Sequence, residues 1–266
     1  EIQASDWSSD VCSSDLTARK TIVVWFSCGA ASAVAAKLTL QKYGSTHNVR
    51  VVNNIVAEED PDNRRFLADV EAWLGVTIEV AGNPKYPDNS AVSVWEDRSF
   101  MSGPKGAPCT IELKKVARQL WERNNHHDHL VMGFTAEEVG RHKRFVLTER
   151  SNVLPILIDA GMSKQDCFDY LAAEGIRLPN VYDQGYPNAN CKGCVKASSP
   201  TYWNHVREVD PDVFTARAKQ SRKLGVRLVR VNNVRVYLDE LSPDAKGRPM
   251  KTLKMPDCGI FCEEKA

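Results

Sequence analysis

The sequence lacks long apolar segments: no run approaches the roughly 20 residues that a membrane-spanning helix needs. The start of the chain also lacks a charged region followed by an apolar stretch, the pattern of a secretory signal. An excess of charge is missing as well, because 35 Lys and Arg stand against 34 Asp and Glu, a net charge of +1. No global field therefore steers the protein towards nucleic acid or a membrane, and an anionic ligand must be bound locally. These absences predict a cytoplasmic protein.

Internal repeats are absent, and the one segment of biased composition lies near the start of the chain. Residues 6–16 read DWSSDVCSSDL, which resembles one translated frame of a sequencing-adapter oligonucleotide. We therefore interpret residues 1–17 as an artefactual leader and expect the fold to begin near Thr17. The alternative is a genuine, disordered leader rich in Ser and Asp.

The length of 266 residues and the hydrophobic content of 42% suit one large α/β domain with a small appendage. β-Branched and aromatic runs alternate with segments that form helices well. Strands are expected at Lys20–Phe26, Val49–Val56, Val76–Val80, His129–Met132 and Val153–Ile158, and helices at Ala33–Tyr43, Asp62–Leu74, Thr110–Asn124 and Ser163–Glu174. This alternation predicts an α/β fold with a doubly wound, parallel, five-stranded sheet.

The chain changes character beyond Gly175, where a loop rich in Pro, Asn, Gly and Tyr begins. Helices are expected near Thr201–Val209 and Pro211–Leu224. Asn232 and Asn233 separate two short apolar segments and favour a tight hairpin turn, because asparagine tolerates positive φ. We therefore divide the chain into an α/β domain at 18–180 and a cysteine-containing C-terminal appendage of helices and a β-hairpin at 181–266.

A loop of small residues, SCGAAS, joins the first predicted strand to the first predicted helix. Its members are Ser27, Cys28, Gly29, Ala30, Ala31 and Ser32. At such a junction, backbone N–H groups and the positive end of the helix bind phosphate when small side chains let the ligand approach. The loop is thus a candidate phosphate site; the alternative is an ordinary tight turn between a strand and a helix.

A second candidate segment follows the fourth predicted strand and reads GFTAEE at 133–138. Arg141 and Arg144 come behind it, with Glu138 beside them. Guanidinium groups suit the planar, bidentate recognition of phosphate or sulfate, so these residues are candidates for nucleotide binding. The alternative is a solvated basic helix face.

Outside the leader, two close pairs of thiols and an odd total indicate metal or redox chemistry in a reducing compartment. The seven cysteines are Cys28, Cys109, Cys167, Cys191, Cys194, Cys258 and Cys262. Cys191 and Cys194 form a C-x-x-C motif, and together with Cys258 and Cys262 they suit a tetrahedral structural zinc site. Cys167, on its predicted helix, is expected to be a buried inert thiol.

The SCGAAS loop resembles the S-G-G-x-D-S loop of PP-loop pyrophosphatases, with Cys28 at the second position and Ala31 in place of the acid. The missing acid weakens the case for metal-assisted ATP cleavage and favours the sulfonucleotide (PAPS/APS) reductases of the same superfamily, whose Ser-rich loops lack it. The polar EEDPDN segment at 58–63 and the GFTAEE segment follow in that family's order. The resemblance implies a HUP/Rossmann-like fold that binds an adenine nucleotide. It extends to PP-loop proteins of phages and mobile elements.

The cysteine spacing resembles that of iron-sulfur APS reductases, which carry a Cys-Cys pair and a C-x-x-C about eighty residues later. Cys109 precedes the C-x-x-C at about this distance, but Thr110 replaces the second cysteine of the pair. The resemblance implies a four-iron four-sulfur cluster on Cys109, Cys191 and Cys194. The fourth iron is either open, as in some base-thiolating PP-loop enzymes, or closed by Cys262 or Cys258.

The segment KMPDCGI at 254–260 resembles the K-x-E-C-G-x-H tail of the reductases, whose cysteine attacks the sulfur of the bound sulfonucleotide. The resemblance makes Cys258 the candidate nucleophile, and Lys254 would favour its thiolate. Two departures stand beside it, since Asp257 replaces Glu and Phe261 stands where the family has His. Cys258 and Cys262 are alternatively metal ligands, or a nucleophile and its resolving thiol.

Three functions are therefore open. The first is a PAPS/APS reductase of sulfur metabolism, in which an external thiol such as thioredoxin releases sulfite. The second is an ATP-dependent PP-loop thiotransferase that modifies a nucleobase with sulfur from an iron-sulfur cluster. The third is a non-catalytic module that is stabilised by zinc and binds nucleic acid. The near-neutral net charge argues against this third function. The sequence leaves the substrate, the sulfur acceptor and the oligomeric state open.

Overall fold

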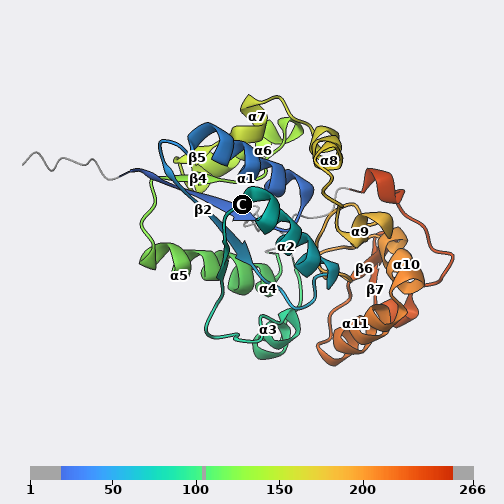
Figure 1. Ribbon diagram of the computed structural model, residues 1–266. Helices are drawn as coiled ribbons and strands as arrows, with labels where there is room; N and C mark the ends of the chain where they lie inside the picture. The colour runs from blue at the N-terminus through green and yellow to red at the C-terminus, as the bar shows by residue number, and fades with distance from the viewer. Residues whose placement is uncertain (1–18, 104–105, 254–266) are drawn as a thin grey trace, which may run out of the picture.

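The computed structural model describes residues 19–103 and 106–253, and its centre is a five-stranded parallel sheet (Figure 1). The strand order is β3-β2-β1-β4-β5. The strands are β1 (Thr21–Phe26), β2 (Asn48–Asn54), β3 (Ile78–Ala81), β4 (His129–Val131) and β5 (Val153–Leu154). Every neighbouring pair runs parallel, as the alternation of strands and helices predicts.

Helices cover both faces of the sheet, because β1 is apolar on both sides. Ile22, Val24 and Phe26 pack in one core with α1, α2 and α8, whereas Val23 and Trp25 belong to a second core with residues of α5 and α6. The helices of this unit are α1 (Ala30–Tyr43), α2 (Asp62–Leu74), α5 (Ala117–Asn124), α6 (Val139–Thr148), α7 (Ile156–Asp159) and α8 (Lys164–Ala173). The doubly wound α/β prediction is confirmed.

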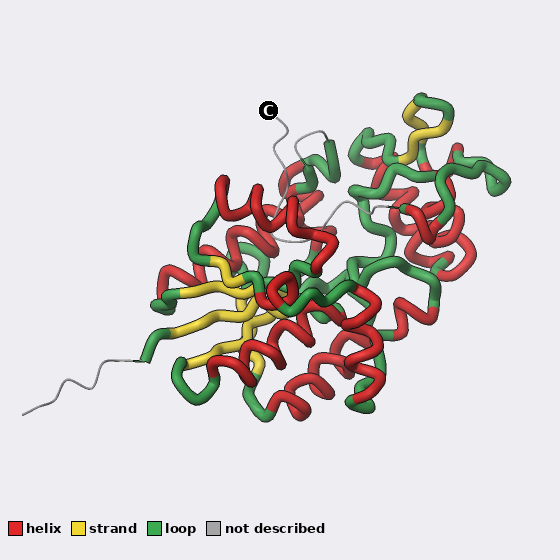
Figure 2. The backbone as a smooth tube through the Cα atoms, turned by 90° about the horizontal axis from the view of Figure 1, so that it is seen from above, coloured by secondary structure: helices red, strands yellow, loops and turns green. Residues whose placement is uncertain are grey.

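The C-terminal part of the described chain lies beside the sheet unit (Figures 1 and 2). Its elements are α9 (Asn180–Asp183), α10 (Pro200–Val209), α11 (Pro211–Lys223), β6 (Val229–Val231), β7 (Val234–Val236), η3 (Leu238–Glu240) and η4 (Met250–Thr252). Asn232 and Asn233 turn the hairpin with φ values of 47° and 64°, as predicted. The core around the fully buried Trp203 also takes in α3 (Ala91–Arg98) and α4 (Pro108–Thr110), so it includes residues far upstream of position 181.

Among the described residues, several elements differ from the sequence-based expectation, since α6, α7 and α9 were not predicted as helices. The strand predicted at 153–158 ends at Leu154, because Pro155 has no N–H to donate to a ladder, and α7 begins directly after it. Helix α3 was not predicted. Ser90 caps it by accepting from the N–H groups of Val92 and Ser93, and the distant Glu58 carboxylate accepts from Ala91 N at 2.7 Å.

The helix predicted at 110–124 is present but contains a π-helical stretch, η1 (Ile111–Val116), between α4 and α5. Such stretches often mark functional sites, because they rotate side chains out of the regular helical series. None of the helices formed by residues 19–103 and 106–253 has the length and apolar character needed to cross a membrane.

Candidate functional site

The strand order reverses between β1 and β4, since the chain runs from β1 outwards to β3 and then returns to β4 on the other side. In open parallel sheets, the crevice at the carboxyl ends of two such strands is the usual ligand site. The SCGAAS loop follows β1, and Gly133 follows β4. A Cβ atom added to Gly133 would lie 2.8 Å from the Ser32 nitrogen, so the two loops are in backbone contact and only glycine fits.

Hydrogen bonds within the SCGAAS loop hold it in one conformation. The Ser32 hydroxyl donates to the Gly29 carbonyl at 2.9 Å and accepts from the Ser27 N–H at 3.1 Å. Cys28 has a φ of 54°, in the left-handed region that favours glycine, the residue found here in the PP-loop pattern. Helix α1 then starts with no side-chain cap and no acidic residue in its first turn. Its positive end is therefore left for an anion.

Tyr182 of α9 lies against the same helix end. Its hydroxyl would be 3.6 Å from a Cβ atom on Gly29. Burial raises the pKa of Tyr182 to about 12, against the opposite effect of the backbone N–H groups of Ala30 and Ala189. The hydroxyl thus stays protonated at neutral pH and is a donor beside the candidate phosphate loop. Nothing local in the sequence signals this role, because the tyrosine lies far along the chain.

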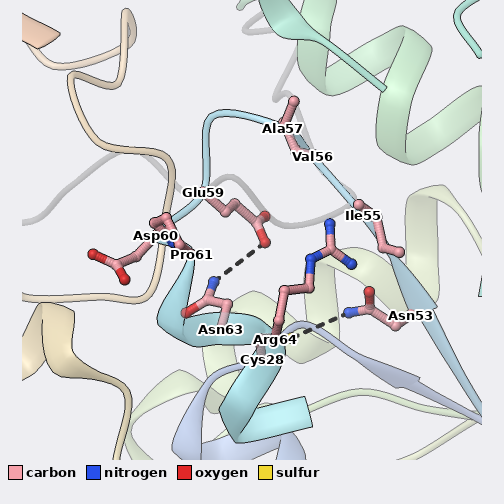
Figure 3. A pocket seen from close by; sticks show the side chains of 10 residues that line it. All are labelled: Cys28, Asn53, Ile55, Val56, Ala57, Glu59, Asp60, Pro61, Asn63 and Arg64. Carbon is pink, nitrogen blue, oxygen red and sulfur yellow. Dashed lines mark hydrogen bonds between the residues drawn. The ribbon is translucent and has the colours of Figure 1, made fainter. Parts of the chain in front are cut away.

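A cavity of about 230 Å³ opens beside the loop, between the end of β2 and the first turn of α2 (Figure 3). It is lined by Cys28, Asn53, Ile55, Val56, Ala57, Glu59, Asp60, Pro61, Asn63 and Arg64. The polar segment at 58–63, expected near the nucleotide, therefore forms much of this wall. Cys28 is the one predicted loop residue in the lining.

The acidic side chain of Glu59 in the cavity wall has a cationic partner, whereas the cationic side chain of Arg64 faces the cavity. Glu59 accepts from Lys114 of η1 at 3.2 Å and from the Asn63 amide at 3.3 Å, and both Glu59 and Lys114 are largely buried. Arg64 extends from α2 towards the cavity (Figure 3) and forms no ion pair with any residue that the structure describes. Arg64 is not among the site residues predicted from the sequence. Its signal is an arginine in the first turn of a helix, where the helix dipole disfavours a cation.

Replacing Arg64 with glutamine is expected to weaken adenine-nucleotide binding about tenfold, because one charge-assisted contact to phosphate is lost. Isothermal titration measures the affinity. Arg65→Gln is the matched control, since Arg65 is engaged by Asp62 and Asp69 and should affect stability rather than affinity. Equal losses of affinity in the two variants would show that Arg64 has no specific contact with the nucleotide.

The predicted anion-binding residues after β4 do not line the cavity. Arg141 pairs with Glu138 at 2.5 Å and lies over the Phe134 ring. Glu138 also accepts from the Thr135 N–H at 3.1 Å in a capping box at the start of η2 (Ala136–Glu138), while Arg144 is exposed. The segment therefore lies next to the loop through Gly133, but the Arg141 charge is already compensated. A role for Glu138, Arg141 and Arg144 in nucleotide binding stays a prediction.

Cys28 and Cys167 are buried thiols. Burial, as the largest effect, raises the pKa of Cys28 to about 12, and the Asn53 amide donates to its sulfur at 3.5 Å. Burial likewise raises the pKa of Cys167 to about 12. The prediction of a buried Cys167 is confirmed, and neither thiol suits a nucleophile.

Cys28 is expected to resist alkylation at pH 8 in the folded protein. A rise of its pKa from 9.0 to about 12 lowers the thiolate fraction about a thousandfold. Peptide mapping after iodoacetamide treatment measures the extent of reaction, and the denatured chain provides the fully reactive control. Rapid labelling of native Cys28 would contradict this assignment.

The structure brings three of the predicted metal ligands into one region. Cys194 is buried in the C-terminal core, and Cys109 and Cys191 pack against it. Burial lowers the pKa of the neighbouring Arg217, whereas Glu58 and the three cysteines raise it. All three thiols therefore lie within electrostatic range of this buried guanidinium. Arg217 also donates to the Gly193 carbonyl at 3.3 Å, inside the C-x-x-C motif.

Thiols are suitable ligands for iron or zinc. Residues 19–103 and 106–253 contain no group of three or more His, Cys, Asp or Glu side chains placed to hold a metal ion. The candidate nucleophile Cys258 and the candidate ligand Cys262 lie outside the described residues. The assignment of Cys109, Cys191, Cys194 and Cys262 as ligands stays a prediction, and no reaction step below passes through a cluster.

Comparison with known proteins identified one family and similar solved structures. The model of the phosphoadenosine phosphosulfate reductase domain matches residues 21–200. No curated protein matches the chain. The phosphoadenylyl-sulfate (PAPS) reductase from Candida auris, in a phosphate complex, is 13% identical with a TM-score of 0.43, over 62% of this chain and 78% of that chain. The U34-tRNA thiolase NcsA from Methanococcus maripaludis, with its 4Fe-4S cluster, is 11% identical with a TM-score of 0.42, over 78% and 72%.

Proposed function

Since this chain belongs to the phosphoadenosine phosphosulfate reductase domain family, a family of enzymes that act on adenine nucleotides, we propose that it reduces an adenine sulfonucleotide, PAPS or APS. The observation that carries the proposal is the SCGAAS loop at the reversal of strand order, in backbone contact with Gly133 and open at the positive end of α1. This arrangement favours a bound phosphate group.

Different residues of the site would contact the phosphate and compensate its negative charge. The N–H groups of Ala31 and Ser32 in the first turn of α1 would hold a phosphate, with the Tyr182 hydroxyl, which accepts from the Ala30 N–H, beside them as a further donor. Arg64 would compensate negative charge on the other side of the loop, where Glu59 is already neutralised by Lys114. The nucleotide is thus held by local donors in a protein of net charge +1.

The proposed chemistry is a thiol displacement at sulfur. The Cys258 thiolate attacks the sulfur of the bound sulfonucleotide, an Sγ–S bond forms, and the bond from that sulfur to the phosphate oxygen breaks. The nucleotide leaves with the oxygen and its electron pair, which leaves an S-sulfonated cysteine. An external dithiol of the thioredoxin type then attacks Sγ and releases sulfite, and its second thiol restores Cys258 while the dithiol becomes a disulfide. The dithiol supplies both electrons.

A substrate comparison tests the proposal. The full chain is incubated with PAPS, APS or ATP together with a reduced dithiol protein, and sulfite, AMP and pyrophosphate are measured. We expect sulfite from one of the two sulfonucleotides and no pyrophosphate from ATP. Sulfite from neither, with AMP and pyrophosphate appearing only when a nucleic-acid acceptor is added, would replace the proposal by ATP-dependent thiotransfer.

The gathering of Cys109, Cys191 and Cys194 around Arg217 favours thiotransfer with an iron-sulfur cluster as the second candidate function. Iron, acid-labile sulfide and zinc are measured in anaerobically purified protein beside a Cys109→Ser variant. Iron that depends on Cys109 would support this candidate, whereas zinc that is indifferent to Cys109 would make the cysteines structural, as in the nucleic-acid-binding alternative.

A further inference from the structure

The wall of the nucleotide cavity is held by the loop that carries the C-x-x-C motif. Lys192, between Cys191 and Cys194, donates its backbone N–H to the Glu58 carbonyl at 3.1 Å. Its ammonium group lies 2.7 Å from an Asp60 carboxylate oxygen and 2.8 Å from one of Asp210. The side chain of Lys192 is 14% exposed and that of Asp60 5%. The motif and the cavity wall therefore share a buried ion pair and a backbone hydrogen bond.

The acidic segment, Glu58–Asp60, is tied to the segment that carries Cys109 as well. Glu59, which lines the cavity, accepts from Lys114 at 3.2 Å, and Lys114 belongs to η1, directly after Cys109. The Glu58 carboxylate accepts from the Ala91 N–H at 2.7 Å at the start of α3. The acidic segment thus contacts α3, η1 and the C-x-x-C loop, and Cys109 lies just before η1 while Cys191 and Cys194 lie in the C-x-x-C loop.

Lys192 sets the orientation of Asp60. One Asp60 oxygen accepts from the Asp62 N–H at 2.8 Å, at the start of α2, and the other faces Lys192. Without the ammonium group, Asp60 and Asp210 would share a largely buried site as two carboxylates with no counter-charge from Lys192. Such a pair separates or takes up a proton, because buried like charges repel strongly. Either response moves the wall beside Arg64 and Asn63.

We propose that Lys192 is a positioning residue that couples the nucleotide cavity to the C-x-x-C loop through Asp60 and Glu58. Nucleotide binding in the cavity stabilises the Lys192 contacts. Because such coupling is reciprocal, stabilising these contacts raises the nucleotide affinity by the same factor. The inference rests on the proposed function in taking an adenine nucleotide as the occupant of the cavity. It adds a link between the cavity and the C-x-x-C cysteines, Cys191 and Cys194. The proposed chemistry at Cys258 does not require this link.

Amide hydrogen exchange tests the coupling directly, because the Lys192 N–H is itself one of the linking donors. The full, reduced chain is measured with and without adenosine 3′,5′-bisphosphate or AMP, neither of which carries a reactive sulfur. We expect the nucleotide to slow exchange in a peptide covering residues 190–195 at least about fivefold in the unaltered protein. A peptide covering the hairpin, residues 229–236, should not respond.

Three variants separate positioning from general stability. Lys192→Gln should still bind nucleotide but lose the exchange response at 190–195. Lys192→Arg, which keeps the charge, should restore it, and Asp210→Asn, which keeps the Lys192–Asp60 pair, should retain it. If Lys192→Gln fails to fold by circular dichroism, the double variant Lys192→Gln/Asp210→Asn removes one charge of each sign and takes its place.

The possible outcomes test the proposed function and the coupling through Lys192 separately. Absence of nucleotide binding by the unaltered protein would overturn the proposed function and the coupling together. Binding with no change in exchange at 190–195 would overturn the coupling alone. A full response that persists in Lys192→Gln, or in the double variant, would also overturn it, because the link would then not pass through Lys192.

Discussion

Alanine at Gly133 is expected to weaken adenine-nucleotide binding by roughly 5- to 150-fold, the equivalent of the 1–3 kcal/mol that overpacking typically costs. The added Cβ would lie 2.8 Å from the Ser32 nitrogen and 3.0 Å from the Ala31 carbonyl carbon. Both atoms are backbone, so no side-chain rotation relieves the contact. The SCGAAS loop must shift away from β4, and its N–H groups then no longer converge on one phosphate position.

Gly140→Ala is the matched control for this variant. A Cβ atom on Gly140 meets nothing within 4 Å, and the residue lies in α6, where alanine is favoured over glycine. Affinity is measured by isothermal titration with the same nucleotide for both variants, and folding by thermal denaturation. Unchanged affinity in a folded Gly133→Ala protein would mean that the loop at 27–32 is an ordinary turn rather than the phosphate site.

Serine in place of Cys258 is expected to lower the rate of sulfite release by more than about a thousandfold, because the attacking thiolate is lost and a serine hydroxyl is a far weaker nucleophile. Nucleotide affinity should change little, since the groups proposed to hold the phosphate lie in the SCGAAS loop, on α2 and on α9. Sulfite release under saturating nucleotide and dithiol separates the chemical step from binding.

Cys262→Ser distinguishes the two roles of the C-terminal pair. If Cys258 alone is the nucleophile, the Cys262 variant keeps sulfite release. A loss of iron in both variants would identify the pair as metal ligands, and an activity loss only in Cys262→Ser would reverse the assignment. The most informative control is mass spectrometry of the unaltered protein after PAPS or APS without dithiol, which should detect an S-sulfonated cysteine at position 258.

Local patterns were sufficient for much of the sheet unit. The apolar run at 20–26 is buried on both faces as β1, because a strand between two helix layers needs no polar alternation. Helix α2 spans Asp62–Leu74 as expected and ends at Gly75, whose φ of 69° is a left-handed cap. Ser163 and Asp166 form the predicted capping box of α8. Each of these features depends on residues within a few positions of one another.

Two of the missed features depend on distant partners. Helix α3 has only eight residues, too few to be stable alone, and beyond its local cap Ser90 it is held by Glu58, in the loop after β2, which accepts from the Ala91 N–H. Tyr182 reaches the start of α1 from α9. Arg141 looked like an anion-binding residue from its type, but Glu138 already accepts its charge in the folded chain. The sequence pattern identifies the type of residue at a position but not the residue with which its side chain interacts in the folded chain.

By itself, the sequence determined the parallel α/β sheet, the small-residue loop between β1 and α1, and the family, because periodicity, turn chemistry and motif order are properties of short segments. Tertiary structure alone decided which charges remain for a ligand. Lys114 neutralises Glu59 across 55 positions, Lys192 neutralises Asp60 from the C-x-x-C loop, and Arg64 is left beside the cavity. An ion pair in a folded chain joins groups that the sheet and its crossovers bring together, and no local pattern of residues encodes that distance.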